Sequence, residues 1–316
     1  MRHVDAVGGV LPRLSVETVS RVFGTGGQAF GRRSEAPAHR SAPPFDLRRL
    51  NDAPLARAEA AIRGLCASAY LGDDTALCRV LGRYKMFVDT RDDDLSAHLL
   101  LDGYWEIWVT RVMADLVKPG MVCVDVGAHL GYYTLLMADL VGTSGRVHAF
   151  EPNPALRERL SRSVRANGFE PTVNAHAWPL FDQDDLPVRL IVPPRRPGGG
   201  HVALIDPAVD DGGLRARRLD GFAEIPHVDV VKIDAEGSEL AIWRGMERLL
   251  GQGRPMSVIL EFTSVRYADP GGFLDQFVGA GFSLALADPR SGLRAVTKTE
   301  VLAASAVEDQ MLVLRR

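Results

Sequence analysis

Residues 122–134 read VCVDVGAHLGYYT, and this stretch decides the fold. An apolar run over 121–126 carries Asp125, a glycine turn follows, and a helix-like segment begins after it. This order predicts a buried strand that leads into a helix, whose free N–H groups can receive the polar atoms of a ligand. Gly127 and Gly131 would let the backbone come close to that ligand where a Cβ would clash.

A second acidic residue follows the next apolar run. Residues 150–153 read FEPN, so Glu151 ends the predicted second strand, where a carboxylate can accept both hydroxyls of a ribose. The spacing Asp-x-Gly-x-x-x-Gly differs from the Gly-x-Gly-x-x-Gly of dinucleotide-binding dehydrogenases. It favours a single nucleoside with an amino-acid tail over NAD. The plainer alternative, that Asp125 only caps the turn and Glu151 faces water, stays open.

Outward from this stretch, strands and helices alternate, which predicts an α/β fold with a mostly parallel sheet covered on both faces. The strands are expected at 121–126, 146–150, 172–177, 228–233, 257–262, 282–287 and 310–314, with an extra strand at 186–192 before a Pro/Gly loop at 193–200. The helices are expected at 132–141, 154–167, 239–250 and 271–281.

The N-terminal part of the chain has a different character. Residues 1–44 are rich in Gly, Arg and Pro, which predicts a mobile segment with a short helix over 14–23. Residues 45–118 predict a cap of helices and one small strand, followed by the cofactor-binding domain at 119–316. Within the cap we expect helices at 54–66, 75–81 and 95–116, the last broken near Gly103, and a strand at 84–88.

Composition excludes several classes of protein. The chain has 316 residues and a net charge of −3, which gives no reason to expect nucleic acid or an anionic membrane as a partner. Three cysteines make no disulfide framework, and no apolar run reaches the length of a membrane helix, so we expect a cytoplasmic protein. A homodimer is compatible with the sequence.

A group of charged residues ends the fourth and fifth strands. Val230, Lys232 and Asp234 should project to one face of the sheet, and Glu236 follows in the loop. Glu261 lies near the end of the neighbouring strand. We predict that Asp234 or Glu236 orients or deprotonates an acceptor, with Glu261 beside them. A structural ion-pair network is the alternative, and although three carboxylates could bind Mg²⁺, we expect no metal.

Five stretches of this sequence resemble the FkbM family of methyltransferases. They are GYWE at 103–106, the turn at 125–134, FEPNP at 150–154, KIDAEGSE at 232–239 and ILEF at 259–262. The resemblance implies a Rossmann-like class I methyltransferase fold, with a mostly parallel seven-stranded sheet and, here, an N-terminal helical extension. It also implies S-adenosylmethionine as cofactor and O-methylation of a hydroxyl on a small natural product or sugar.

The resemblance also implies a set of cofactor-binding residues. Ala177 and Trp178 would lie near the adenine, although Trp178 could equally be a core residue. Tyr132 and Tyr133 could face the sulfonium, but ordinary packing is favoured for Tyr133. His129 stands where the family usually has Asn. The full set is Glu106, Asp125, Gly127, Ala128, His129, Gly131, Tyr132, Tyr133, Glu151, Pro152, Asn153, Ala177, Trp178 and Asp234. The alternatives are a non-catalytic cofactor-binding partner subunit, or an enzyme with a carboxylate, nitrogen or peptide acceptor.

Overall fold

The computed structural model describes residues 43–52, 54–206 and 213–316. The predicted helix at 14–23, and nearly all of the segment predicted to be mobile, lie outside these residues.

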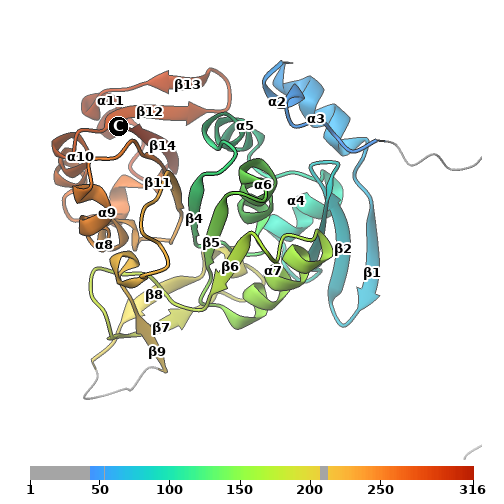
Figure 1. The fold of residues 1–316 in the computed structure, drawn as a ribbon, viewed down its shortest axis with the longest axis horizontal. Coiled ribbons are helices and arrows are strands. Elements are labelled where there is room, and N and C mark those ends of the chain that lie inside the picture. The colour runs from blue at the N-terminus through green and yellow to red at the C-terminus, as the bar shows by residue number, and fades with distance from the viewer. Residues whose placement is uncertain (1–42, 53, 207–212) are drawn as a thin grey trace, which may run out of the picture. The chain divides into compact units, whose positions relative to one another are not determined.

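The large sheet has the α/β architecture that the alternating pattern predicts (Figure 1). Four strand pairs at its centre are parallel, and the pairs that involve the last three strands are antiparallel. Its eight strands run in the order β13 (Gly292–Ala295), β12 (Ser283–Asp288), β14 (Gln310–Arg315), β11 (Ser257–Phe262), β10 (Val230–Ile233), β4 (Val122–Val126), β5 (Arg146–Phe150) and β6 (Val173–His176).

Seven of these strands are the predicted ones, and β13 is an additional edge strand. All four residues of β13 are exposed, so it carries no alternation of apolar and polar residues that could reveal it. Its pairing with β12 alone makes it a strand.

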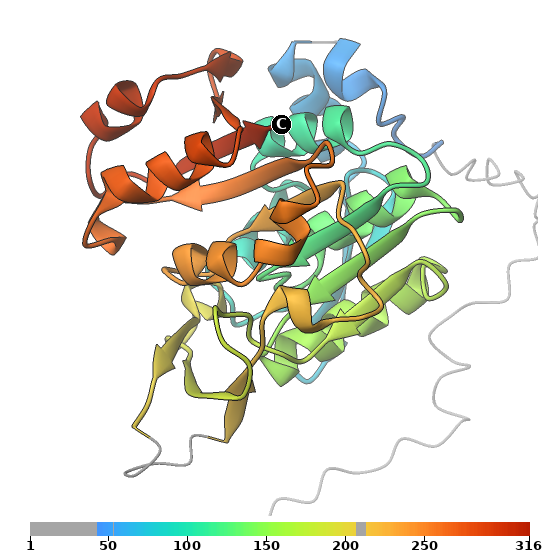
Figure 2. The ribbon, with the colours of Figure 1, turned by 60° about the vertical axis from the view of Figure 1, so that its left-hand side comes forward.

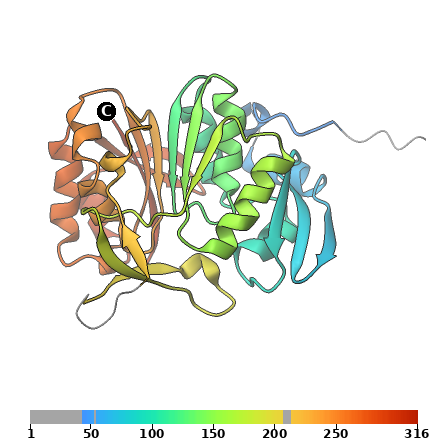
Figure 3. The same cartoon turned by 60° about the horizontal axis from the view of Figure 1, so that its bottom comes forward.

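Helices cover both faces of the sheet (Figure 3). The side chains of β10 point alternately into two hydrophobic cores, one on each face of the sheet. Val230 belongs to the core that contains α5 (Ile107–Leu116), α6 (Tyr132–Val141) and α7 (Pro154–Ala166). Val231 and Ile233 pack on the other side with α8 (Glu239–Arg244), α9 (Glu247–Gly251) and α10 (Pro270–Gly279). The two-faced pattern predicted for strand four is therefore confirmed.

The helix expected at 239–250 is divided into α8 and α9. Gly245 ends α8, and a Cβ at this position would lie 2.2 Å from the carbonyl oxygen of Phe181. This close approach of a distant segment, invisible in the local sequence, accounts for the glycine at the break.

The cap contains more strand than the sequence predicts. The helix expected at 75–81 is wrong: these residues form β2 (Thr75–Val80), between β1 (Ser68–Gly72) and β3 (Tyr84–Asp89) in an antiparallel sheet. The strand at 84–88 and the 54–66 helix, observed as α3 (Leu55–Arg63), are confirmed. So is the broken helical region, observed as α4 (Leu95–Leu101) and α5. Cross-strand pairing with β3 overrides the local pattern of β2.

The cap and the large sheet share one core on the α5–α7 side. Hydrogen bonds reinforce this packing: the Phe87 amide donates to the Ser163 hydroxyl at 3.0 Å, and the Asn167 amide pairs with both backbone groups of Lys85. Helix α7 is thereby held between two sheets, and its N-terminal end lies next to Glu151.

Three strands that come between β6 and β10 in the sequence form a third, small sheet (Figures 1 and 2). It consists of β8 (His201–Leu204), β7 (Leu186–Ile191) and β9 (Leu214–Ala216). The extra strand predicted at 186–192 is therefore present, but in a sheet of its own. The other α-helices in the described part of the chain are α2 (Arg49–Asp52) and α11 (Lys298–Ala303). Within the described ranges, no helix combines the length and apolar character needed to cross a bilayer.

Candidate active site

A cavity of about 390 Å³ opens at the carboxyl ends of β4, β5, β10 and β11. This is the edge at which open α/β sheets bind ligands. Thirteen predicted site residues line it: Glu106, Gly127, Ala128, His129, Tyr132, Tyr133, Glu151, Pro152, Asn153, Trp178, Asp234, Glu236 and Glu261. Asp125, Gly131 and Ala177 do not.

The glycine turn is shaped by the protein's own packing. Gly127 has φ +72°, and a Cβ there would overlap the carbonyl oxygen of Asp234. Gly131 has φ +90°, and its missing Cβ leaves room for Leu160. The expectation that both glycines make room for a ligand therefore needs correction, because chain atoms fill these two spaces.

Asp125 lies behind the cavity wall and is almost fully buried. One carboxylate oxygen accepts a hydrogen bond from the Thr134 hydroxyl at 2.5 Å, and the other has no partner among the described residues. Burial raises the pKa of Asp125, while the nearby Lys232 ammonium lowers it. In this position the carboxylate ties β4 to the first turn of α6.

Glu151 does reach the cavity. Its two oxygens accept backbone N–H groups from His129 and Asn153, each at 2.8 Å. Burial raises the pKa of Glu151 to about 7 despite these two bonds. Since each carboxylate oxygen has a second acceptor position, the group can still bind hydroxyls.

His129 adopts a left-handed conformation, with φ +52°, at the entrance to α6. Both ring nitrogens are buried without a hydrogen-bond partner in the described part of the chain. Burial lowers the pKa of His129 to about 4, so the imidazole is neutral near pH 7. Buried polar atoms without partners cost free energy, which a ligand that bonds to this ring would recover.

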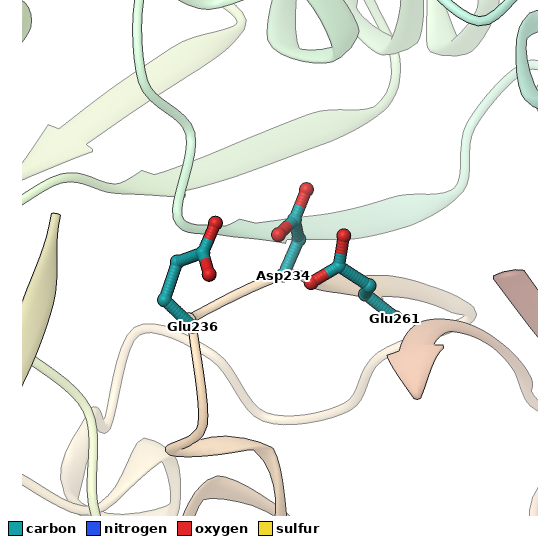
Figure 4. A group of neighbouring side chains, drawn as sticks. All are labelled: Asp234, Glu236 and Glu261. Atoms are coloured by element: carbon teal, nitrogen blue, oxygen red, sulfur yellow. The ribbon is translucent and has the colours of Figure 1, made fainter. Parts of the chain in front are cut away.

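Three carboxylates of the cavity wall gather together (Figure 4). Asp234, Glu236 and Glu261 each place one oxygen within 4.8 Å of the others. Burial, followed by repulsion from Asp234, raises the pKa of Glu261 to about 8. Burial raises the pKa of Glu236 to about 7. The sequence therefore correctly placed these three groups together.

Two cations pair with this cluster. The Lys232 ammonium donates to Asp234 at 2.9 Å, which supplies the partner that a buried lysine requires. The Arg266 guanidinium binds Glu261 at 2.6 Å and Glu236 at 2.7 Å. Sequence reasoning missed Arg266, because it follows β11 in an irregular turn and belongs to no motif. The arrangement of carboxylates is one that oxygen-binding metals use, but two side-chain cations already pair with it.

Glu106 and Tyr133 form the wall next to Lys232. Tyr133 donates its hydroxyl to Glu106 at 3.0 Å, and the Lys232 ammonium lies 5.0 Å from the centre of the Tyr133 ring. Burial and the charge of Asp234 raise the pKa of Glu106 to about 7. The Tyr133 ring thus already contacts a cation of the protein itself. Tyr132 is buried beside it, with its hydroxyl 3.0 Å from that of Thr110.

Glu239 stabilises the loop after β10 through hydrogen bonds. Its carboxylate accepts the backbone N–H groups of Ala235 and Gly237, and the hydroxyl of Tyr267 at 2.7 Å. It therefore fixes the loop that carries Glu236, and as the first residue of α8 it places negative charge where a helix favours it.

Of the two residues predicted to lie near the adenine, Trp178 lines the cavity and Ala177 does not. Trp178 lines the cavity, is 40% exposed, and has the Arg217 guanidinium 5.3 Å from its ring centre. Ala177 is exposed and lies off the cavity wall, because the chain turns there from β6 toward the small sheet. Apolar residues of that small sheet, Leu190 and Val202, line the cavity as well, and no motif signals them.

Comparisons with known proteins identify a methyltransferase domain in this chain. The methyltransferase FkbM domain matches residues 125–284. The hexuronic acid methyltransferase AglP of Haloferax volcanii is 29% identical over 166 residues. That match covers 49% of this chain and 66% of AglP, so this chain spans slightly less than two thirds of its relative.

Solved structures give weaker matches. P. horikoshii TYW2 in complex with MeSAdo has a TM-score of 0.41 and 14% identity, over 78% of this chain and 72% of that one. Fibrillarin of Aeropyrum pernix, with natively bound S-adenosyl-L-methionine, has a TM-score of 0.39 and 12% identity, and the match covers 79% of this chain and 99% of fibrillarin. Scores of this size leave the fold to be judged from the strand order above.

Proposed function

This chain belongs to the FkbM methyltransferase family, whose cofactor is S-adenosylmethionine, and from this premise we propose that it methylates a hydroxyl oxygen of a small-molecule acceptor. The observation that carries the proposal is the cluster of Asp234, Glu236 and Glu261 in the wall of the cavity that begins at the Gly127 turn. A hydroxyl acceptor needs alignment and the removal of a proton, and carboxylates can do both.

The residues of the cavity fit the cofactor. Glu151 offers acceptor positions for ribose hydroxyls, and the two unpartnered nitrogens of His129 offer bonds to polar groups of the amino-acid part. Among the charged residues of the wall, acidic side chains outnumber basic ones, which suits a cationic sulfonium. When bound, the cofactor supplies the methyl group on that sulfonium.

We assign the acceptor side to Asp234 and Glu236. Burial brings the pKa of Glu236 to about 7, close to the value at which a general base works best near neutral pH. Asp234, held by Lys232, can orient the acceptor through a hydrogen bond. Removal of the proton by Glu236 would leave the hydroxyl oxygen aligned for in-line displacement.

Carbohydrates come first among the acceptors to be tested. AglP carries a hexuronic acid in its name, and a sugar offers several hydroxyls of ordinary acidity. A polyketide or peptide hydroxyl belongs to the same reaction class. The fold itself selects no acceptor.

The decisive experiment measures transfer of labelled methyl from S-adenosylmethionine to a panel of hexuronic acids, neutral glycosides, polyketides and peptides. Asp234→Asn and Glu236→Gln should lose turnover by at least about 10²-fold, because a positioned base contributes 10²–10⁴-fold. Their affinity for S-adenosylmethionine, measured by calorimetry, should stay within about threefold of the wild type. EDTA should leave turnover unchanged.

Glu170→Gln is the matched control, since Glu170 is an exposed surface carboxylate whose ion pair among the described residues is with Arg165, at 3.4 Å. It should behave like the wild type. Full activity in both Asp234→Asn and Glu236→Gln would refute the assignment of the base, and failure of the wild type to bind the cofactor would refute the proposed function.

A further inference from the structure

Arg266 is a charged residue next to the site to which the proposed function gives no role. It ends the short turn η3 (Ser264–Arg266), directly after β11, and its side chain is 24% exposed. Its guanidinium lies behind the cavity wall and does not line the cavity. It therefore can act on the acceptor only through other residues.

Arg266 pairs with three carboxylates, of which Asp309 is the most distant at 3.7 Å. The two that it binds most closely come from different elements. Glu261 belongs to β11, whereas Glu236 lies in the loop after β10. One terminal nitrogen of the guanidinium meets Glu261 at 2.6 Å and the other meets Glu236 at 2.7 Å. A planar guanidinium with diverging donors suits such a double contact, which a lysine ammonium cannot reproduce.

The loop that carries Glu236 also has an unusual backbone. Glu236 itself has φ +52° and Gly237 has φ +105°. A left-handed conformation at a non-glycine residue costs free energy and persists only where surrounding contacts hold it. Glu239 holds this loop through its backbone, and Arg266 holds the Glu236 side chain.

We propose that Arg266 is a positioning residue of the acceptor side: it holds Glu236 and Glu261 next to each other and opposes their protonation. The proposal rests on the proposed function, in which Glu236 receives the acceptor proton. Only an ionised carboxylate can do so.

The negative charges around Glu236 and Glu261 call for a cation next to these two carboxylates. Asp234 after β10, Glu239 at the start of α8 and Asp309 before β14 all add negative charge around Glu236. Apart from Arg266, Lys232 is the other cation close to the cluster, and it is paired with Asp234. Burial raises the pKa of both glutamates, and the Arg266 charge opposes that rise. Without it, the two carboxylates would be driven toward the protonated form.

The test uses the full-length protein and requires no acceptor. Glutamate labelled with ¹³C at the carboxyl carbon is titrated by NMR in the wild type, Arg266→Met and Arg266→Lys, with signals assigned through Glu236→Gln and Glu261→Gln. In Arg266→Met, at least one of the two carboxyls should titrate one or more pH units higher, the size expected for loss of an adjacent opposite charge. Arg266→Lys, which can pair with only one carboxylate at a time, should restore part of the shift.

Arg218→Met is the control. Arg218 also contacts two carboxylates, Asp220 at 3.5 Å and Glu247 at 3.0 Å, and its side chain is 31% exposed, but it lies outside the cavity wall. Its loss should leave the titration of Glu236 and Glu261 unchanged. Thermal unfolding of each variant shows whether it is folded. If Arg266→Met is not folded, the titration of Arg266→Lys decides alone, with an upward shift of at least half a unit expected.

Unchanged titration of both carboxyls in the folded Arg266 variants would overturn the proposal. Failure of the proposed function would instead appear as absent cofactor binding or label transfer in the wild type, and would leave these titrations as they are. With an acceptor from the labelled-methyl panel, the acid limb of the rate profile of Arg266→Met should move upward in pH by the same amount.

Discussion

Two groups of carboxylates at the cavity, which we call the cofactor end and the acceptor end after their proposed roles, are held in different ways. At the cofactor end, Glu151 is bound by two backbone N–H groups, and Asp125 behind it by the Thr134 hydroxyl. At the acceptor end, Asp234 is bound by Lys232, and Glu236 and Glu261 by Arg266. Neutral groups donate the hydrogen bonds to the first pair, and charged groups donate those to the second group.

The proposed function offers a reason for this difference, because the two ends would bind different partners. Neutral donors fix a carboxylate in space, but they stabilise its charge less than a cation does. A sulfonium cofactor brings positive charge into the cavity, whereas a hydroxyl acceptor brings none. We infer that the protein therefore supplies its own cations at the acceptor end, where a carboxylate must stay ionised before the reaction.

The largest effect is expected where the two ends meet, at Gly127. Gly127→Ala would place a Cβ against the Asp234 carbonyl oxygen at φ +72°, so the end of β10 must move. We expect a loss of about 4 kcal/mol in the free energy of unfolding, measured with urea. Gly168→Ala is the matched control, since it has φ +73° and open space around it. It should lose only about 1 kcal/mol, and equal losses in the two variants would contradict the close approach.

Removing the cation of the acceptor end should have the next largest effect. Burial lowers the pKa of Lys232, but Asp234 and Asp125 outweigh this and raise it to about 12. Lys232→Met leaves these carboxylates without a cation, and we expect a loss of about 3 kcal/mol in urea denaturation at pH 7. Lys298→Met, which breaks an exposed pair with Asp275, should lose less than about 1 kcal/mol. A similar small loss for Lys232→Met would show that the buried pair is not needed.

At the cofactor end, Glu151 should make the free energy of unfolding depend on pH. The pKa of Glu151 is raised by burial to about 7 in the folded protein, above its ordinary 4.5. The folded state therefore holds a proton that the unfolded state has lost, and stability falls as the pH rises from about 5 to 8. In the cofactor-free protein, Glu151→Gln should reduce this fall by about 2 kcal/mol. An equal fall with pH in wild type and variant would mean that Glu151 is ionised throughout.

The smallest effect is expected from His129→Asn, which introduces the residue that the resemblance associates with this position. Asn tolerates the left-handed conformation and offers polar atoms in place of the two unpartnered ring nitrogens. Affinity for S-adenosylmethionine, measured by calorimetry, should change by less than about threefold. His129→Leu, which removes both polar atoms, should weaken binding about tenfold. Equal binding by both variants would show that the ring makes no bond to the cofactor.

Local sequence determined the strand, turn and helix around Gly127, the acid after β5 and the carboxylates after β10 and in β11. Each of these lies within or next to a strongly patterned segment, and parallel strands bring their carboxyl ends to one edge whatever else the chain does. The alternation of strands and helices therefore predicted both the sheet and the group of acids at its edge.

Contacts between distant segments decided the rest. Pairing with β3 made a strand of residues 75–80, and pairing with β12 made β13. The fold also placed Asp125 behind the wall and brought Arg266 between two glutamates. Neither result can be deduced from a neighbouring residue, because the energy of a pairing or a charge contact depends on groups that only the folded chain brings within a few ångströms.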